Sequence, residues 1–240
     1  MPAWRYADFV AVTGPAWRAL CPTADFRIAT HPDDTATQAA ALEAGAYVHV
    51  TDAWIRPGPV RNARGDRPVL NKALALDEAF GFVGDMSPPA VGEICVSIDA
   101  DVYPLGAMPP DEAIASDVLY GCPRYECLTP AALEAHRAGR YPLARMKLLQ
   151  PRSRKHGEPA NQWNTAGTPE QAARKGLGYF QCFRYRPGFR FGSYWNAARY
   201  DKDVWKQFAS KAAMPGLYVL HLGTLDQRNW SGRTVAPWNG

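Results

Sequence analysis

Short apolar runs alternate with amphipathic segments through the first half of the chain. Apolar runs of strand length lie at 26–30, 47–51 and 94–98. Between the first two, residues 35–45 have a capping-box start and a glycine stop, which predicts a helix. A second helix is predicted over 73–83, where apolar residues recur on one face. The alternation predicts an α/β fold with a doubly wound, mostly parallel sheet and helices on both faces.

The pattern is less regular in the second half. Threonine followed by proline at 129–130 and 168–169 predicts two helix starts, because proline is favoured in the first turn. A further helix is predicted over 200–208 and a last strand over 217–222. Residues 152–164 are polar and predict a mobile loop.

The composition is that of an ordinary soluble enzyme domain. The 240 residues are 47% hydrophobic and 21% charged, and we expect a single domain over 1–240. No apolar run approaches the length that crosses a bilayer, and residues 1–8 lack the features of a secretory signal. The five cysteines form no C-x-x-C pair, so free thiols and a cytoplasmic location are predicted, Cys122 and Cys127 included.

Charge is distributed unevenly, although the net charge is only +4. Residues 1–136 carry 9 basic and 18 acidic side chains, whereas residues 137–211 carry 16 basic and 4 acidic ones. Such asymmetry is typical of two halves that face different partners. The alternative is that the two halves attract each other.

The strongest local motif is the D-x-D sequence of Asp99 and Asp101, directly after the apolar run 94–98. Ligands bind at strand ends in open α/β sheets, and two carboxylates spaced by one residue can reach one site there. Carboxylate oxygens are ligands for Mg²⁺ or Mn²⁺. The alternative is a turn that carries two solvated aspartates.

The order of several short motifs resembles the GT-A glycosyltransferases, which bind nucleotide sugars. The first-half pieces are 70–76, 92–94 and 98–101, and the second-half pieces are 178–183 and 219–223. The resemblance implies a single GT-A-like (Rossmann-like) domain. About 1–105 would bind the nucleotide sugar, and about 106–240 would bind the acceptor.

The resemblance also implies a metal-dependent reaction. Asp99, Asp101 and His221 would hold Mn²⁺ or Mg²⁺ against the diphosphate of the donor, which in this family is most often a UDP-sugar. The alternative for His221 is a hydrogen-bonded core histidine. Asp33 or Asp34 would contact the nucleotide base, and the donor site would be lined by Asn71, Lys72 and Asp99.

The resemblance also implies which residue takes the proton from the acceptor hydroxyl. Asp203, with Asp201 as its rival, would be the general base of an inverting enzyme; the alternative is a charged helix face. Arg233 would close over the phosphates, or would be an exposed arginine near the end of the sequence. The first strand of the GT-A domain is abbreviated, or the chain lacks a few leading residues, because 4–9 stands where that strand should already have ended.

The basic residues of the second half indicate the chemical class of the acceptor. Basic residues interleave with aromatic ones in the second half, and this combination suits a nucleic acid. The chain then resembles phage DNA-modifying glycosyltransferases, whose acceptor is a hydroxymethylated base flipped out of the helix, in a bacterial or phage-infected cell. The basic residues are Arg152, Arg154, Lys155, Arg184, Arg186 and Arg190, and the aromatic ones are Tyr179, Phe180, Phe183, Tyr185, Phe189, Phe191, Tyr194 and Trp195.

Other interpretations stay open. The basic and aromatic residues could form an aromatic core with a solvated basic face. A glycosyltransferase of cell-envelope glycans or lipids would use the same arginines, and a nucleotidyltransferase or phosphatase would use the same aspartates. A non-catalytic nucleic-acid-binding protein explains the basic half but leaves Asp99, Asp101 and His221 without a role.

Overall fold

The computed structural model describes residues 1–52, 71–151, 163–165, 179–192, 203–223 and 238. The first part contains the helices α1, α2 and α3 and the first three strands. Their bounds are α1 (Ala7–Leu20), β1 (Arg27–Thr30), α2 (Thr35–Glu43), β2 (Tyr47–Val50), α3 (Lys72–Ala79) and β3 (Ile94–Ile98). The remaining elements are β4 (Val102–Gly106), η1 (Asp111–Ala113), β5 (Val118–Gly121), β6 (Arg124–Cys127), α4 (Pro130–Arg137), η2 (Leu143–Arg145), β7 (Leu148–Pro151), β8 (Trp163–Thr165), β9 (Phe180–Arg184), β10 (Ser210–Ala213) and β11 (Leu217–Leu222).

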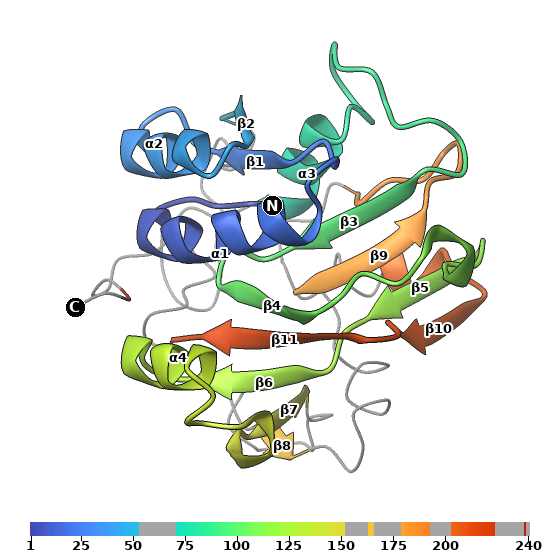
Figure 1. Cartoon of the computed structure of the whole chain (residues 1–240). Helices are drawn as coiled ribbons and strands as arrows, with labels where there is room; N and C mark the ends of the chain where they lie inside the picture. Colours follow the sequence, from blue (N-terminus) through green and yellow to red (C-terminus); the bar gives the residue numbers. More distant parts are fainter. Residues whose placement is uncertain (53–70, 152–162, 166–178, 193–202, 224–237, 239–240) are drawn as a thin grey trace, which may run out of the picture.

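The strands form three hydrogen-bonded groups (Figure 1). One pairs β1 with β2, a second has the order β10-β5-β9-β3, and a third has the order β4-β11-β6-β7-β8. Because β3 runs directly into β4 through the turn at 99–101, the second and third groups meet at that turn.

The α/β class is confirmed, but the prediction of a mostly parallel sheet is wrong. Five of the eight pairings between described strands are antiparallel. Parallel neighbours need a long crossover, usually a helix, whereas antiparallel neighbours can be joined by short connections. Helix α4 lies between β6 and β7, and these two strands nevertheless pair antiparallel, as do β7 and β8.

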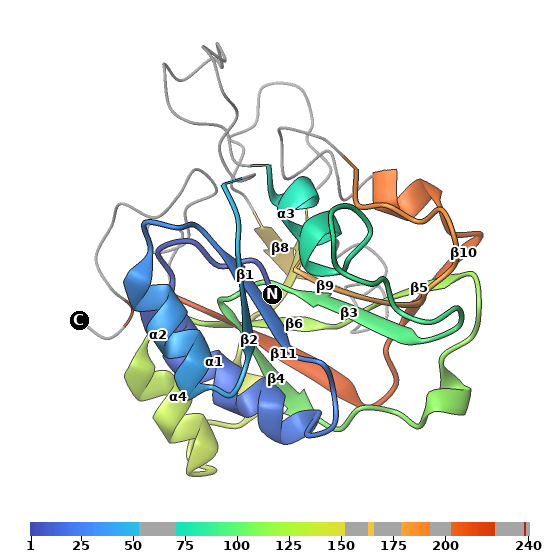
Figure 2. The same cartoon turned by 90° about the horizontal axis from the view of Figure 1, so that it is seen from above.

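Helices cover both faces of β3, as predicted. Trp17 of α1 packs in one core cluster with Ile98, whereas Ala73 and Leu76 of α3 pack in a second cluster with Cys95. Seen from above, α1 and α3 lie on opposite sides of β3 (Figure 2). The first cluster contains residues from both halves of the sequence, so the halves share one core.

Most predicted elements lie where the pattern placed them, but several observed elements were not predicted. Strands β4 to β7, β9 and β10 are among these. Helix α1 is another; its buried residues recur on one face although Pro15 stands inside it. The polar stretch 152–164 was predicted as a loop, but its described end belongs to β8. The helix start at 168–169 lies outside the described residues.

Two predictions from composition can be checked directly. All five cysteines are free, and burial raises the pKa of Cys127 to about 11. None of the helices in the described ranges is long and apolar enough to cross a membrane.

Candidate functional site

The D-x-D turn is held in place by α1. The hydroxyl of Thr13 donates to the carbonyl oxygen of Ala100 at 2.8 Å, and the indole N–H of Trp17 donates to the carbonyl of Val102 at 2.7 Å. Both donors are buried. The net contribution of such a hydrogen bond to the free energy of unfolding is about 1 kcal/mol. The loss is larger when breaking the bond leaves a buried carbonyl group unpaired. The turn is therefore fixed from the helix side.

Strands β9 and β11 fix the same turn from the other side. The amide of Asp99 donates to Tyr179 O at 2.9 Å, and the amide of Leu222 donates to Asp101 O at 2.8 Å. In the antiparallel register of β11 and β4, His221 lies opposite Val102. This register carries His221 to the turn from the far end of the sequence.

The side chains of Asp101 and His221 face each other. Asp101 Oδ2 lies 3.3 Å from His221 Nε2, and both side chains are less than a tenth exposed. Asp99 instead forms an ion pair with the ammonium group of Lys72, the first residue of α3. Within the described ranges, no three His, Cys, Asp or Glu side chains converge as a ligand set for a metal ion.

Two cations act on the partly buried carboxylate of Asp99. Burial raises the pKa of Asp99, and the charge of Asp101 raises it further, while Lys72 and Arg124 act in the opposite direction. Arg124 of β6 is buried, and its guanidinium carbon lies 4.2 Å from the ring centroid of Tyr179. The sequence analysis missed Arg124, because no motif around it indicates a role at the turn.

Polar side chains without partners lie behind the Lys72–Asp99 pair. Asn71 caps α3 through Oδ1, which accepts from the amide of Leu74 at 3.1 Å. Its Nδ2, the hydroxyl of Ser97 and the amide group of Gln181 are buried and have no hydrogen-bond partner among the described residues. Ser97 and Gln181 stand opposite each other on β3 and β9. Uncompensated polar groups of this kind are uncommon in protein interiors and mark this strand end as a candidate site.

A second group of side chains lies at the end of β1. The rings of Trp4 and His31 are stacked with their centroids 4.7 Å apart, and Asp33 Oδ1 accepts from the indole of Trp4 at 3.1 Å. His31 Nδ1 lies 2.5 Å from the same oxygen. Asp33 is half exposed. The sequence analysis assigned no functional role to Trp4 or His31.

The neighbouring Asp34 has a structural role. Its Oδ1 accepts from the amide of Thr37 and caps α2, and its Oδ2 accepts from the amide of Arg5 and from the hydroxyl of Thr30. The cap is therefore Asp34 and not the predicted Thr35. Because both of its oxygens are occupied, Asp33 is the better candidate for a nucleotide contact.

The predicted general bases are not brought to the turn by any described contact. Asp203 accepts from Lys206 Nζ at 3.0 Å, and the neighbouring Val204 packs in the aromatic cluster beyond α3. Asp201 and Arg233 lie outside the described residues. The assignment of a general base stays a prediction.

The described part of the basic and aromatic half is largely structural. The guanidinium of Arg184 donates to three carbonyl oxygens, those of Gly92, Asp111 and Ile114. Arg186 pairs with Asp117. The aromatic residues of the proposed stacking surface are buried, and the prediction that they offer ring faces to a nucleic acid is wrong for Tyr179, Phe180, Phe183, Tyr185, Phe189 and Phe191. The residues of this set outside the described ranges are Arg152, Arg154, Lys155, Tyr194 and Trp195.

Comparisons with known proteins give no relative. No protein-family model, no curated protein and no solved structure matches this chain.

Proposed function

We propose that this chain is a metal-dependent glycosyltransferase that transfers a sugar from a nucleotide-sugar donor to an acceptor hydroxyl. The observation that carries the proposal is the pair of Asp101 and His221, 3.3 Å apart at the end of β3. The Lys72 cation beside Asp99 adds positive charge at the same strand end. An acid–imidazole pair next to fixed cations suits a phosphorylated ligand.

The residues present fit a divalent cation. A carboxylate oxygen and an imidazole nitrogen are both ligands for Mn²⁺, and the diphosphate and water would complete the set. When bound, the metal would supply positive charge to the departing diphosphate. Asp101 and His221 would hold it; Asp99 would join them only on release from Lys72.

The remaining groups bind and orient the donor in this proposal. Lys72, no longer paired with Asp99 once a diphosphate arrives, would pair with phosphate oxygens, and the buried Arg124 would keep the site positive. Asp33, with the stacked rings of Trp4 and His31, would receive the base at the end of the neighbouring strand β1. A UDP-sugar is the expected donor.

The acceptor remains a separate question. The excess of basic residues over 137–211 still suits a polyanion such as hydroxymethylated phage DNA. No described aromatic surface supports DNA over a glycan or lipid acceptor. The acceptor proposal is therefore limited to a hydroxyl group on an anionic molecule.

Thermal unfolding with UDP, GDP, ADP or CMP, each with and without Mn²⁺, tests the donor site. We expect a rise in melting temperature with UDP that requires Mn²⁺, since a ligand that binds only the folded state stabilises it. The Asp101→Asn variant should lose the rise, whereas Glu112→Gln, at an exposed position, should keep it. The absence of a metal-dependent shift with every nucleotide would contradict the proposal. Hydrolysis of UDP-sugars without an acceptor then separates a transferase from a nucleotide-binding protein.

A further inference from the structure

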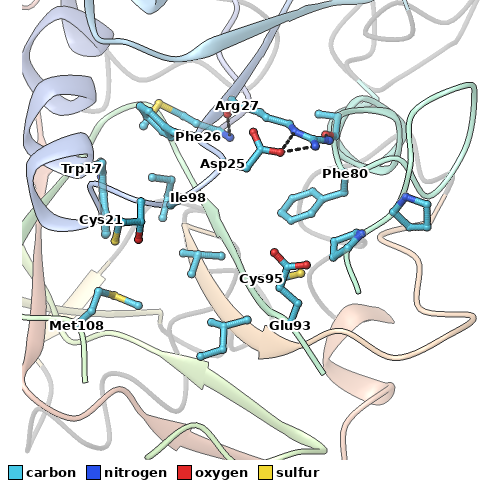
Figure 3. A pocket seen from close by; sticks show the side chains of 18 of the residues that line it. Trp17, Cys21, Asp25, Phe26, Arg27, Phe80, Glu93, Cys95, Ile98 and Met108 are labelled. Atoms are coloured by element: carbon cyan, nitrogen blue, oxygen red, sulfur yellow. Dashed lines mark hydrogen bonds and ion pairs between the residues drawn. The ribbon is translucent and has the colours of Figure 1, made fainter. Parts of the chain in front are cut away.

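A cavity of about 420 Å³ lies between β1 and β3 (Figure 3). Trp17 and Cys21 of α1 and Met108 line it on one side. Ala79 and Phe80 at the end of α3 line it on the other, and the ring of Phe80 points into it. These two groups belong to opposite faces of the sheet, because α1 and α3 cover opposite faces of β3. The cavity therefore passes through the plane of the sheet.

The cavity opens at the other end of these strands from the candidate donor site. Residues 25–27 line it at the start of β1, and Glu93 and Ile94 line it at the start of β3. Asp33 and the D-x-D turn instead follow the last residues of the same two strands. A ligand of the cavity would therefore occupy a site separate from that of a nucleotide sugar.

The backbone of β3 points hydrogen-bonding groups into this cavity. Asp99 N donates to Tyr179 O, and Tyr185 N donates to Glu93 O, so the odd-numbered residues of β3 pair with β9. In an antiparallel ladder, the alternate residues direct their N–H and C=O groups to the opposite edge. Among the described residues, none pairs with that edge of β3. The residues with outward groups are Ile94, Val96 and Ile98, and all three line the cavity.

These outward groups form acceptor–donor pairs. The carbonyl of Ile94 and the amide of Val96 point to the same edge, and so do the carbonyl of Val96 and the amide of Ile98. Backbone groups of this kind cost free energy when they are buried without a partner. Because they lie in the plane of the sheet, a ligand that pairs with them presents its own donor and acceptor in that plane. The faces of such a ligand then lie toward α1 and α3.

Aromatic side chains stand on both faces and are held in place by other contacts. The indole of Trp17 donates to Val102 O at 2.7 Å. The ring of Phe80 packs against Phe82 and Phe191, with centroid distances of 5.4 and 5.3 Å. Preformed apolar walls with a few polar groups are typical of small-molecule sites, and the cavity volume is in their range.

We propose that the cavity binds a planar heteroaromatic compound whose edge carries an adjacent hydrogen-bond donor and acceptor, as in a nucleobase or a lactam. The edge pairs with the outward groups of β3, and the ring packs between Trp17 and Phe80. Aromatic walls favour a flat ring. The side chains of a peptide strand would instead project from the sheet into both walls.

The thiol of Cys21 gives the first test. Cys21 lines the cavity and is partly exposed, whereas the other four cysteines are buried. Burial raises the pKa of Cys21, so its alkylation by iodoacetamide is followed at about pH 9. The probes are carbostyril, a bicyclic lactam, and N-methylcarbostyril, which lacks the N–H donor. We expect carbostyril to protect Cys21, and the methylated compound to need an about tenfold or more higher concentration, because a backbone carbonyl stays unpaired.

Amide hydrogen exchange locates the contact on β3. Bound carbostyril should slow exchange at Val96 or Ile98 about tenfold or more, because the ligand accepts from one of these amides. Exchange at Cys95 and Ser97, which already pair with β9, should stay unchanged.

A matched pair of variants at one position tests the cavity itself. Cys21→Phe places a larger side chain in the cavity and should abolish the binding of carbostyril, measured by titration calorimetry. Cys21→Ser keeps the size of the side chain and should bind as the unmodified protein does. Equal binding to both variants would place the ligand elsewhere and contradict the proposal.

Three further outcomes would overturn the proposal. In the first, carbostyril and its methylated derivative protect Cys21 equally, so that the edge of β3 is not read. In the second, neither compound protects it. In the third, an extended apolar peptide slows exchange at Val96 and Ile98 where carbostyril does not. The tests need neither metal nor nucleotide, and Asp101→Asn should leave them unchanged, so this site and the proposed transferase activity can fail separately.

Discussion

Asp101 Oδ2 lies 3.3 Å from His221 Nε2, although β4 and β11 supply the two residues from distant parts of the sequence. The contact depends on strand register: His221 stands opposite Val102, and the amide of Leu222 donates to Asp101 O. A shift of one residue along β11 would turn the imidazole to the other face of the sheet. The pair is thus a product of the antiparallel pairing that the sequence pattern did not predict.

His221→Ala tests this pair as a metal site. The variant should bind UDP in the presence of Mn²⁺ roughly tenfold or more weakly, because even the loss of an outer partner of a metal ligand typically has that effect. Calorimetric titration with Mn²⁺ and UDP measures it, and Tyr218→Phe on the same strand is the control. Unchanged affinity would identify His221 as a core histidine.

Thr13→Val tests the support of the D-x-D turn. The substitution keeps the shape of the side chain but removes the hydroxyl that donates to Ala100 O. We expect a loss of about 1–2 kcal/mol in the free energy of unfolding, because a buried carbonyl loses its donor. Urea denaturation measures the loss, and Thr13→Ser, which retains the donor, should lie close to the unmodified protein. A Thr13→Val variant as stable as the unmodified protein would contradict the supporting role of the hydroxyl.

Arg184 and Arg186 form a matched pair that tests the structural role of Arg184. Arg184→Met should lower the free energy of unfolding by roughly 2–4 kcal/mol, because three carbonyl oxygens lose a charged donor. Arg186→Gln should lower it by less than about 1 kcal/mol, since its pair with Asp117 is exposed. Denaturant unfolding of both variants checks the contrast. Similar stability of the two would contradict the structural role of Arg184.

Asp77 should make stability depend on pH. Its two oxygens accept from the amides of Phe191 and Gly192, at 2.7 and 3.2 Å, and burial nevertheless raises its pKa to about 6. The folded state then holds the proton more tightly than the unfolded state, whose carboxyl has a pKa near 3.8. Stability should therefore fall as the pH rises from about 4 to about 6, by roughly 3 kcal/mol from this group, and stay level above that range.

The Asp77→Asn variant isolates that contribution. Its free energy of unfolding should lack the decline between pH 4 and pH 6, although its absolute value will differ, because an amide oxygen replaces two carboxylate oxygens. Urea denaturation at intervals of pH compares the two slopes. Parallel curves for the two proteins would mean that Asp77 titrates normally.

The sequence by itself determined several of the local elements and the D-x-D position. Apolar runs and caps placed β1, α2, β3 and β11, because strand and helix periodicities are local properties. Asp99 and Asp101 could be selected because a strand end before two carboxylates is visible in a few residues. Helix α1 was not predicted, because Gly14 and Pro15 interrupt the pattern that its buried face would otherwise show.

Only the tertiary structure decided which side chains meet. Charge and composition suggested that Arg184 and Phe183 face a partner. In the structure Arg184 donates to backbone carbonyl groups, and Phe183 packs in the aromatic core. Trp4, Arg124 and Thr13 carried no local signal, since each acts through a residue far away in the sequence. Pairing between distant strands fixed the sheet order and the Asp101–His221 contact. Such pairing depends on register and on burial across the whole core, which no short stretch of sequence contains.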